Sequence, residues 1–295
     1  MVQKGKGFQI FAQIIMILLV LFSLIPFVLL FMSSITEEKT LIVDGYSFFP
    51  RQFSTYAYSY LFSGSNNGMI RAYGISFLIT SWGTILNVSL TTLFAYPLSR
   101  KELPGRNFFA FFLFFTMLFS GGLVPSYIMW TRTFHIQNTL FALLVPNLML
   151  SAFNVIMMRT YLTGNIPDAV IEAARIEGAG EFRILFSVVL PMAKPILATV
   201  ALLVGLGYWN DWTNGLYYIN DDRLYSIQVL LTSIQRNMEA LKQSMASGGS
   251  TSNADLPSTS VRMAITVLGI LPILVIYPFV QKFFVKGIAI GAVKG

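Results

Sequence analysis

Charged side chains gather in one short stretch of an otherwise apolar chain. Five of them fall within twelve residues, namely Glu172, Arg175, Glu177, Glu181 and Arg183. Long apolar runs stand on both sides, and charges at the centre of a bilayer are costly. The stretch is therefore expected to lie in water beside a membrane. Its small and charged residues suit a contact surface for another protein rather than a catalytic site.

Local sequence signals predict a helix, a turn and a second helix over residues 168–183. Asp168 is expected to cap the first helix, because its carboxylate can accept backbone N–H groups. Gly178 and Gly180 allow that helix to end in a tight turn. The second helix is expected to start near Phe182. Two prolines should then interrupt its hydrogen-bond ladder, namely Pro191 and Pro195.

Several residue types within this stretch agree with a known pattern. They are Glu172-Ala173-Ala174, Gly178-Ala179, Leu190-Pro191 and Pro195. In type and spacing the stretch resembles the EAA loop of binding-protein-dependent ABC importer permeases. Glu177 departs from the family pattern, which usually has Asp there, but it keeps the negative charge.

The resemblance implies a type I ABC importer permease fold with a cytoplasmic EAA coupling loop at 168–183. In that family the helix at 168–178 is the coupling helix, seated in a groove of a separate ATP-binding subunit. The residues expected to couple this chain to the ATPase are Glu172, Ala173, Ala174, Arg175, Glu177 and Gly178. The C-terminal tail of related permeases reaches the same interface, which adds Lys294.

Composition indicates an integral membrane protein. Of the 295 residues, 55% are hydrophobic and 11% are charged, whereas soluble domains carry about 25% charged residues. The chain has no cysteine and one histidine, which excludes thiol chemistry and a histidine-rich metal site. The net charge of +7 comes from basic residues at the ends of apolar segments, so nucleic acid is not an expected partner.

Apolar segments long enough to cross a bilayer predict an all-α protein with six transmembrane helices. About 20 apolar residues span the hydrocarbon core. The predicted spans within a permease domain at 8–284 are 8–32, 72–97, 107–129, 139–158, 184–207 and 262–284. The first run exceeds the apolar core of a signal peptide, so we expect it to remain as a span.

Six spans place both termini on one side of a bacterial plasma membrane. Basic residues concentrate in short segments near the termini, in the 98–106 loop and around the charged stretch. The positive-inside rule therefore predicts a cytoplasmic N-terminus at 1–7 and a cytoplasmic tail at 285–295. Residues 208–261 form the expected extracellular loop, with an amphipathic helical pattern at 224–241.

Other motifs are similar to those of carbohydrate importers of the maltose-permease type. They are Leu103-Pro104-Gly105-Arg106, Tyr208-Trp209-Asn210-Asp211-Trp212 and the ending Gly291-Ala292-Val293-Lys294-Gly295. The run from Phe119 to Pro125 resembles the subgroup that imports oligosaccharides or polysaccharide fragments in Gram-positive bacteria. The resemblance implies that the chain moves an oligosaccharide.

Sugar recognition combines aromatic stacking with amide and carboxylate hydrogen bonds. The candidate sugar-contact residues are Tyr208, Trp209, Asn210, Asp211, Trp212 and Asn154. Two other interpretations stay open. Aromatic residues are also common at a membrane boundary, and asparagines within spans often bond neighbouring helices. In maltose-type complexes the partner permease holds most of the sugar.

The chain contains no glycine-rich phosphate loop followed by Lys-Ser or Lys-Thr, so the energy source is expected to be a separate protein. The resemblance implies a second, homologous permease in a heterodimer, two ATP-binding subunits that use ATP and magnesium, and an extracellular solute-binding lipoprotein. No cofactor is expected on this chain. The alternatives are the same machine for a non-sugar solute and an ion-coupled secondary transporter. The predicted spans contain no Asp or Glu, which disfavours the second.

Overall fold

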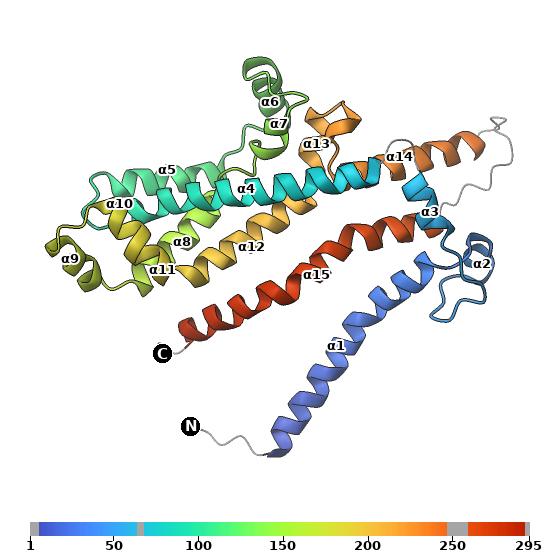
Figure 1. The fold of residues 1–295 in the computed structure, drawn as a ribbon, viewed down its shortest axis with the longest axis horizontal. Helices are drawn as coiled ribbons and strands as arrows, with labels where there is room; N and C mark the ends of the chain where they lie inside the picture. The colour runs from blue at the N-terminus through green and yellow to red at the C-terminus, as the bar shows by residue number, and fades with distance from the viewer. Residues whose placement is uncertain (1–5, 64–67, 247–258, 293–295) are drawn as a thin grey trace. The chain divides into compact units, whose positions relative to one another are not determined.

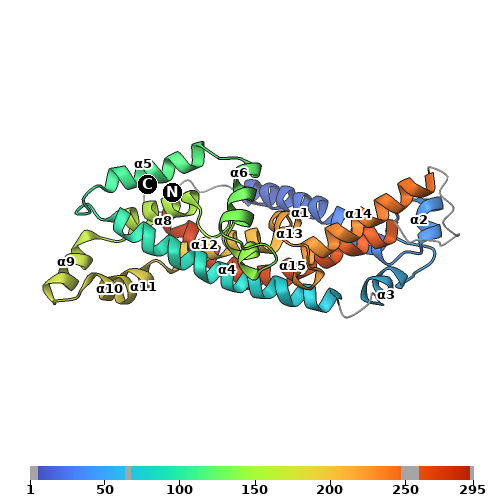
Figure 2. The same cartoon turned by 90° about the horizontal axis from the view of Figure 1, so that it is seen from above.

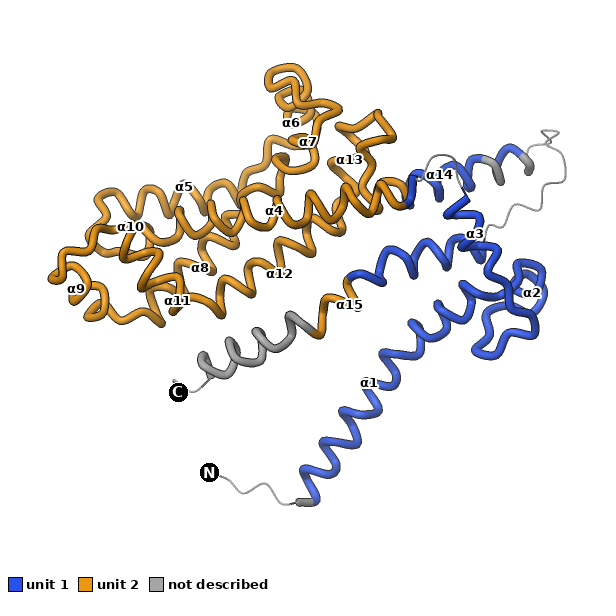
Figure 3. Tube along the Cα trace, in the orientation of Figure 1, with its two compact units in different colours: residues 1–69, 231–272 blue, residues 70–230, 273–295 orange. Residues whose placement is uncertain are grey.

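The computed structural model describes residues 6–63, 68–246 and 259–292. Within these ranges the chain forms helices and an isolated β-bridge between Thr36 and Phe53. Figure 3 divides the chain into two compact units, each described below by itself. The first holds residues 1–69 and 231–272, and the second holds 70–230 and 273–295.

Glu38 connects two helices of the first unit that lie far apart in the sequence. Its carboxylate accepts the backbone N–H groups of Thr259 and Ser260 at 2.9 and 2.8 Å. It also accepts the Ser260 hydroxyl at 2.6 Å. Negative charge is favourable at a helix N-terminus, so Glu38 stabilises the start of α15. The unit contains α1 (Lys6–Ser34), α2 (Glu38–Asp44), α3 (Tyr56–Ser63) and most of α14 (Ile227–Ala246), and α15 (Thr259–Ala292) begins in it.

The second unit is built around one apolar core that the long helices share. In both views the helices α9, α10 and α11 gather at one end of it (Figures 1 and 2). Buried core residues come from α4, α5, α8, α9, α10 and α12 and from residues between these helices. The helices are α4 (Gly68–Ser99), α5 (Arg106–Leu118), α6 (Leu123–Ile128), α7 (Leu140–Leu144), α8 (Ala152–Asn165), α9 (Asp168–Ile176), α10 (Glu181–Ile184), α11 (Leu190–Met192), α12 (Lys194–Asn210) and α13 (Thr213–Tyr218). Shorter turns are η2 (Met129–Thr133), η3 (Leu185–Val189) and η4 (Asp222–Leu224).

Among the described residues, three helices are long and apolar enough to cross a membrane. They lie at Gly7–Ser34, Gly68–Ser99 and Thr259–Pro278, where the sequence predicts the first, second and sixth spans. Two further candidates are bent helix pairs. Arg106–Leu118 and Leu123–Thr133 meet at 110°, and Glu181–Met192 and Lys194–Trp209 meet at 83°. The described part of the chain therefore holds three to five candidate spans, and the count of six stays a prediction.

Both bends occur where the sequence weakens the helix. Gly122 adopts a φ of 82°, which a residue with a Cβ atom rarely takes. The second bend lies at Ala193, between Pro191 and Pro195. Each proline lacks the N–H that would continue the helix and crowds the carbonyl four residues before it. The predicted interruption of this helix is thus confirmed, and it takes the form of a sharp bend.

The fourth span, predicted at 139–158 with an interruption at Pro146-Asn147, is divided into two helices at that place. Helix α7 ends at Leu144 and α8 begins at Ala152, and Asn147 between them has a φ of 61°. Three carbonyls of this interruption accept hydrogen bonds from side chains elsewhere in the unit. Tyr208 Oη donates to Leu144 O at 2.8 Å, Asn214 Nδ2 to Pro146 O at 2.9 Å, and Asn87 Nδ2 to Leu148 O at 2.6 Å.

The apolar pattern predicted at 224–241 corresponds to α14. Ile227, Leu231 and Met238 follow one another at helical spacing and are buried. The extracellular loop predicted at 208–261 therefore contains ordered helices, α13 and α14, before the segment 247–258, which lies outside the described residues.

Helices α4 and α12 approach closely because each has a glycine where a side chain of the other helix packs. A Cβ atom added at Gly83 of α4 would clash with the ring of Tyr208 on α12. A Cβ added at Gly205 would lie 3.4 Å from the Thr84 hydroxyl. Small residues at such interfaces let two helix backbones come together inside a membrane.

Replacing Gly83 by alanine is expected to destabilise the purified protein. The Tyr208 ring cannot easily give way, because its hydroxyl is bonded to Leu144 O, and overpacking of this kind costs about 1–3 kcal/mol. The matched control is Gly74→Ala on the same helix, where an added Cβ meets nothing within 4 Å. Thermal unfolding in detergent should separate the two variants. Equal midpoints would contradict the tight α4–α12 contact.

Candidate functional site

Helix α9 begins directly after a proline, and the side chain of its first residue anchors it. Pro167 occupies the N-cap position with extended backbone, and Asp168 is the first helical residue. The predicted capping role of Asp168 is therefore wrong, since its carboxylate lies one position too far along. Asp168 Oδ2 instead accepts a hydrogen bond from Lys101 Nζ at 3.0 Å, and Arg100 Nη1 lies 3.9 Å from Oδ1. Lys101 lowers the pKa of the Asp168 carboxyl below its ordinary value.

The turn after α9 has the geometry that glycine provides. Gly178 has a φ of 80°, and its N–H donates to Arg175 O at 2.9 Å. The N–H of Ala179 donates to Ala174 O at 3.0 Å, which closes the end of the helix. Helix α10 then starts at Glu181, one residue before the predicted position. The predicted order of helix, turn and helix is confirmed.

The two faces of α9 differ in character. Ile171 is 2% exposed, and Ala174 is half-buried against the same core. The opposite face carries Ile176, which is 87% exposed, and the exposed Ala173. Of the remaining predicted coupling residues, Glu172, Glu177 and Gly178 are exposed, Arg175 is paired as described next, and Lys294 lies outside the described residues.

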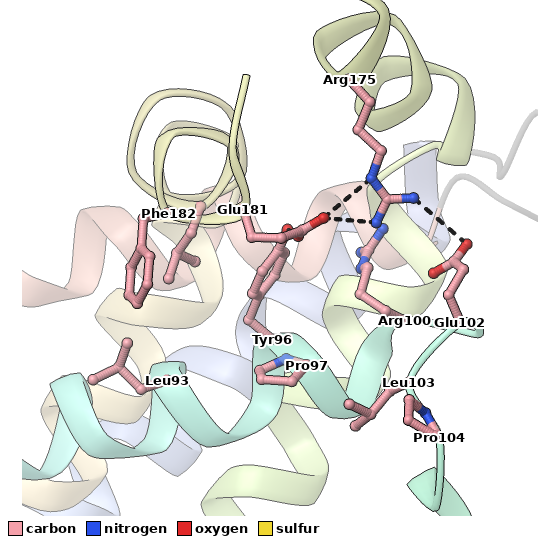
Figure 4. Close-up of a pocket in the computed structure, with 11 residues that line it drawn as sticks. Leu93, Tyr96, Pro97, Arg100, Glu102, Leu103, Pro104, Arg175, Glu181 and Phe182 are labelled. Atoms are coloured by element: carbon pink, nitrogen blue, oxygen red, sulfur yellow. Dashed lines mark hydrogen bonds and ion pairs between the residues drawn. The ribbon is translucent and has the colours of Figure 1, made fainter. Parts of the chain in front are cut away.

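A carboxylate joins α9, α10 and α4 in the network that Figure 4 shows. Arg175 donates to Glu181 Oε1 from Nε at 3.1 Å and from Nη2 at 2.9 Å. The other oxygen, Glu181 Oε2, accepts the Tyr96 hydroxyl at 2.6 Å. Glu102 adds a longer ion pair to Arg175 at 3.9 Å. Tyr96 was not among the predicted site residues, because no local sequence signal marks a partner 85 positions away.

An apolar hollow of about 410 Å³ adjoins this network. Leu93, Pro97 and Leu103 contribute to its lining (Figure 4). Arg100 and Arg175 are among the charged residues that line it. Phe182, which is 73% exposed, also lines it. The network therefore lies between this apolar hollow and helix α9, whose outward face is exposed.

The candidate sugar-contact residues separate into buried and exposed members. Tyr208 and Trp209 are 2% and 4% exposed, and the Trp209 ring centroid lies 5.4 Å from that of Phe77. Asn154 is also buried. Asn210 and Trp212 are the exposed members of the set. Tyr208, Trp209 and Asn154 are thus as deeply buried as the core side chains of this unit.

Asp211 organises the chain beside these residues. Its Oδ1 accepts the backbone N–H groups of Thr213 and Asn214 at 3.1 and 3.3 Å, at the start of α13. Burial raises the pKa of the Asp211 carboxyl above its ordinary value, and the bonds from Asn214 and Thr213 oppose that rise. The carboxylate is thus already engaged by its own backbone. Sugar contact by this set of residues stays a prediction.

Comparisons with known proteins place the chain in a family. No protein-family model matches it. A bacterial ABC transporter that imports the acidic polysaccharide alginate has a chain of similar fold, with a TM-score of 0.77 and 27% identity, covering 95% of this chain and 99% of that one. Protein LplC of Bacillus subtilis (strain 168) is 35% identical over 274 residues, 92% of this chain and 90% of the relative. The chain belongs to the permeases of ABC sugar importers.

A second relative of this ABC sugar permease covers nearly its whole length. YtcP of Bacillus subtilis (strain 168), a polygalacturonan/rhamnogalacturonan transport system permease protein, is 34% identical over 292 residues, 99% of this chain and 100% of the relative. ABC permeases are integral membrane proteins that work with a partner permease, ATPases and a solute-binding protein. They are translocation components rather than enzymes. These relatives favour a sugar over other solutes and an ABC importer over a secondary transporter.

Removing the Tyr208 hydroxyl is expected to weaken the folded permease without a specific effect on sugar. Tyr208→Phe leaves Leu144 O without its donor, and an unpaired buried group costs about 1–3 kcal/mol. Tyr56→Phe, the same change at a side chain 56% exposed, should leave thermal stability nearly unchanged. Unfolding midpoints of both purified variants check this. A Tyr208→Phe protein as stable as the wild type would remove the structural role assigned to that hydroxyl.

Proposed function

We propose that this permease moves an oligosaccharide or polysaccharide fragment into the cytoplasm, and that α9 is its contact with the ATPase. The observation that carries the proposal is the outward face of α9. Ala169, Ala173 and Ile176 are spaced by four and three residues, so they share one side of the helix. All three are exposed. Glu172 and Glu177 flank this apolar stripe.

The stripe suits insertion into a groove of a second protein. Ala169 and Ala173 are small enough to let the helix backbone approach closely, and Ile176 offers an apolar side chain that is 87% exposed. The flanking carboxylates can orient the helix through charged contacts. The inward face, with Ile171 buried, holds α9 to the permease core, so movement of the groove would move the permease.

The membrane arrangement proposed here has six spans and two cytoplasmic termini. The interrupted segment from α7 to α8 forms the fourth span, because three side chains satisfy the carbonyls that the break releases. Basic residues near both termini and around α9 favour the cytoplasmic side. Residues 208–261 then face outward, toward the solute-binding protein, and the tail at 285–295 with Lys294 reaches the ATPase.

The complete importer would contain this chain, a different but homologous permease, two ATP-binding subunits and an extracellular sugar-binding lipoprotein. ATP and magnesium act on the ATPase subunits, and this chain supplies the path and the coupling helix. Closure of the ATPase dimer would be transmitted to the spans as a rigid-body movement.

Acidic sugars are the substrate class that the relatives favour. The names of two of them refer to polygalacturonan and rhamnogalacturonan and to alginate, which carry carboxylate groups. We therefore propose an oligosaccharide with uronate residues as the cargo. Within this chain, Asn210 and Trp212 are the candidate residues whose side chains are exposed enough to contact the sugar, whereas Asn154 is buried.

Placing a charge on the α9 stripe is expected to uncouple the permease from its ATPase. Ile176→Asp puts a carboxylate where an apolar groove should lie, and losing such a contact costs about 2 kcal/mol or more at an interface centre. Copurification of the ATPase subunits and the ATP hydrolysis of the reconstituted complex are the measurements. Both should fall at least tenfold.

The matched control is Val43→Asp on α2, an apolar residue 82% exposed outside the coupling region. It receives the same charge but should keep the ATPase bound. Full ATPase binding by the Ile176→Asp permease would show that α9 is not the contact.

A sugar panel tests the substrate class. In proteoliposomes with the binding protein, trigalacturonate is expected to stimulate ATP hydrolysis more than the neutral trisaccharide raffinose. Stronger stimulation by raffinose would remove the acidic-sugar part of the proposal and keep the oligosaccharide importer. Failure of every oligosaccharide tested would count against the cargo class itself.

A further inference from the structure

Helix α9 is held by a part of the chain that is not its neighbour in sequence. Its covalent neighbours are α8 and α10, yet the polar contacts at both its ends reach the end of α4 and the loop after it. At the first turn, Asp168 bonds Lys101 at 3.0 Å. At the last turn, Arg175 reaches Tyr96 through Glu181.

Glu181 is shared in a way that fixes three helices to one point. One carboxylate oxygen accepts two N–H groups of Arg175 on α9, and the other accepts the Tyr96 hydroxyl of α4 at 2.6 Å. Glu181 itself opens α10. Because each carboxylate oxygen bonds a different helix, none of these three helices can shift by the length of a hydrogen bond without breaking one of these bonds.

The two contacts differ in what they can contribute. Lys101 and Asp168 are well exposed, with side chains 72% and 59% accessible, and exposed ion pairs contribute little. Tyr96 is 5% exposed and belongs to the apolar core. The Tyr96–Glu181 bond is charge-assisted, and its donor is buried although the Glu181 side chain is 53% exposed. It is therefore expected to contribute more than the Lys101–Asp168 pair, in which both side chains are exposed.

We propose that Tyr96 and Glu181 are positioning residues that make α4 move together with α9. Movement of the ATPase is then transmitted to the second span through the Tyr96–Glu181 bond. It also reaches the fourth and fifth spans through the covalent connections of α9 to α8 and α10. This inference rests on the proposed role of α9 as the ATPase contact. It adds a third helix to the path by which that contact acts.

Spin labels can test whether the two helices move as one body. The chain has no native cysteine, so labels at Val170→Cys on α9 and Phe94→Cys on α4, exposed by 38% and 41%, are unique in it. The distance between them is measured in the assembled importer in nanodiscs, without nucleotide and with ATP plus vanadate. With the network intact, the same narrow distance is expected in both states.

Tyr96→Phe keeps the ring and removes the hydroxyl, so the fold should survive. The expected result is a distance that differs between the two nucleotide states, and about a tenfold loss in the stimulation of ATP hydrolysis by the binding protein. A hydrogen bond to a charged group is worth about that factor. Tyr58→Phe is the control, because its hydroxyl also lies at hydrogen-bond distance from another side chain, 2.8 Å from Ser34 Oγ.

Glu181→Gln tests whether the two residues act through the same bond. Combined with Tyr96→Phe, it should add little to the larger of the two single effects, because the Tyr96–Glu181 bond is common to both. Glu181→Gln also weakens the bonds from Arg175, so it is expected to be the larger single effect. Fully additive effects on the stimulation of ATP hydrolysis would overturn the shared role. A purely structural role would lower the yield of complex and leave the interlabel distance as it was.

The outcomes separate this inference from the proposed function. If Tyr96→Phe leaves the distance unchanged in both nucleotide states, the inference is overturned even where Ile176→Asp abolishes ATPase binding. If Ile176→Asp leaves the ATPase bound while Tyr96→Phe changes the distance, α9 and α4 are linked but α9 is not the contact.

Discussion

A carbonyl in the hydrocarbon core of a membrane has no water to bond, so a helix that breaks there needs donors from the protein. The interruption between α7 and α8, which lies in the proposed fourth span, meets this requirement. Tyr208, Asn214 and Asn87 bond the carbonyls of Leu144, Pro146 and Leu148. These donors come from α12, α13 and α4, so the break holds together helices that are otherwise joined mainly by apolar packing.

This constraint also explains residues that look functional in the sequence. Tyr208 and Trp209 belong to a polar and aromatic run of the kind that binds sugars, yet both are buried. Tyr208 is occupied with Leu144 O, and the glycine at position 83 leaves room for its ring. Asp211 is engaged by the start of α13. Side-chain chemistry alone does not reveal whether a polar group serves a ligand or a backbone.

Features set by neighbouring residues were predictable from the sequence. Gly178 and Gly180 mark the turn after α9, and Pro191 and Pro195 mark the break in the helix that follows. The structure agrees to within a residue or two. Apolar length also predicts where the first, second and sixth candidate spans lie. These signals depend only on local backbone preference and on burial in lipid.

Features set by distant pairs were not predictable. The contact of Glu181 with Tyr96 joins positions 85 apart, and Asp168 is held by Lys101 rather than by its own helix. Hydropathy likewise measures the length of an apolar run but not its direction, so the bends of 110° and 83° needed coordinates. Long-range contacts and bend angles of this kind cannot be inferred from a single sequence.

The exposed apolar groups near α9 have a consequence for how the subunit is produced in a cell. Ile176 and Phe182 are 87% and 73% exposed in a segment rich in charge. A copy of this permease without its partners would present such groups to chaperones and proteases, which act on exposed apolar surface. Synthesis of the partners in matching amounts would then set the abundance of the permease, and surplus copies would be degraded.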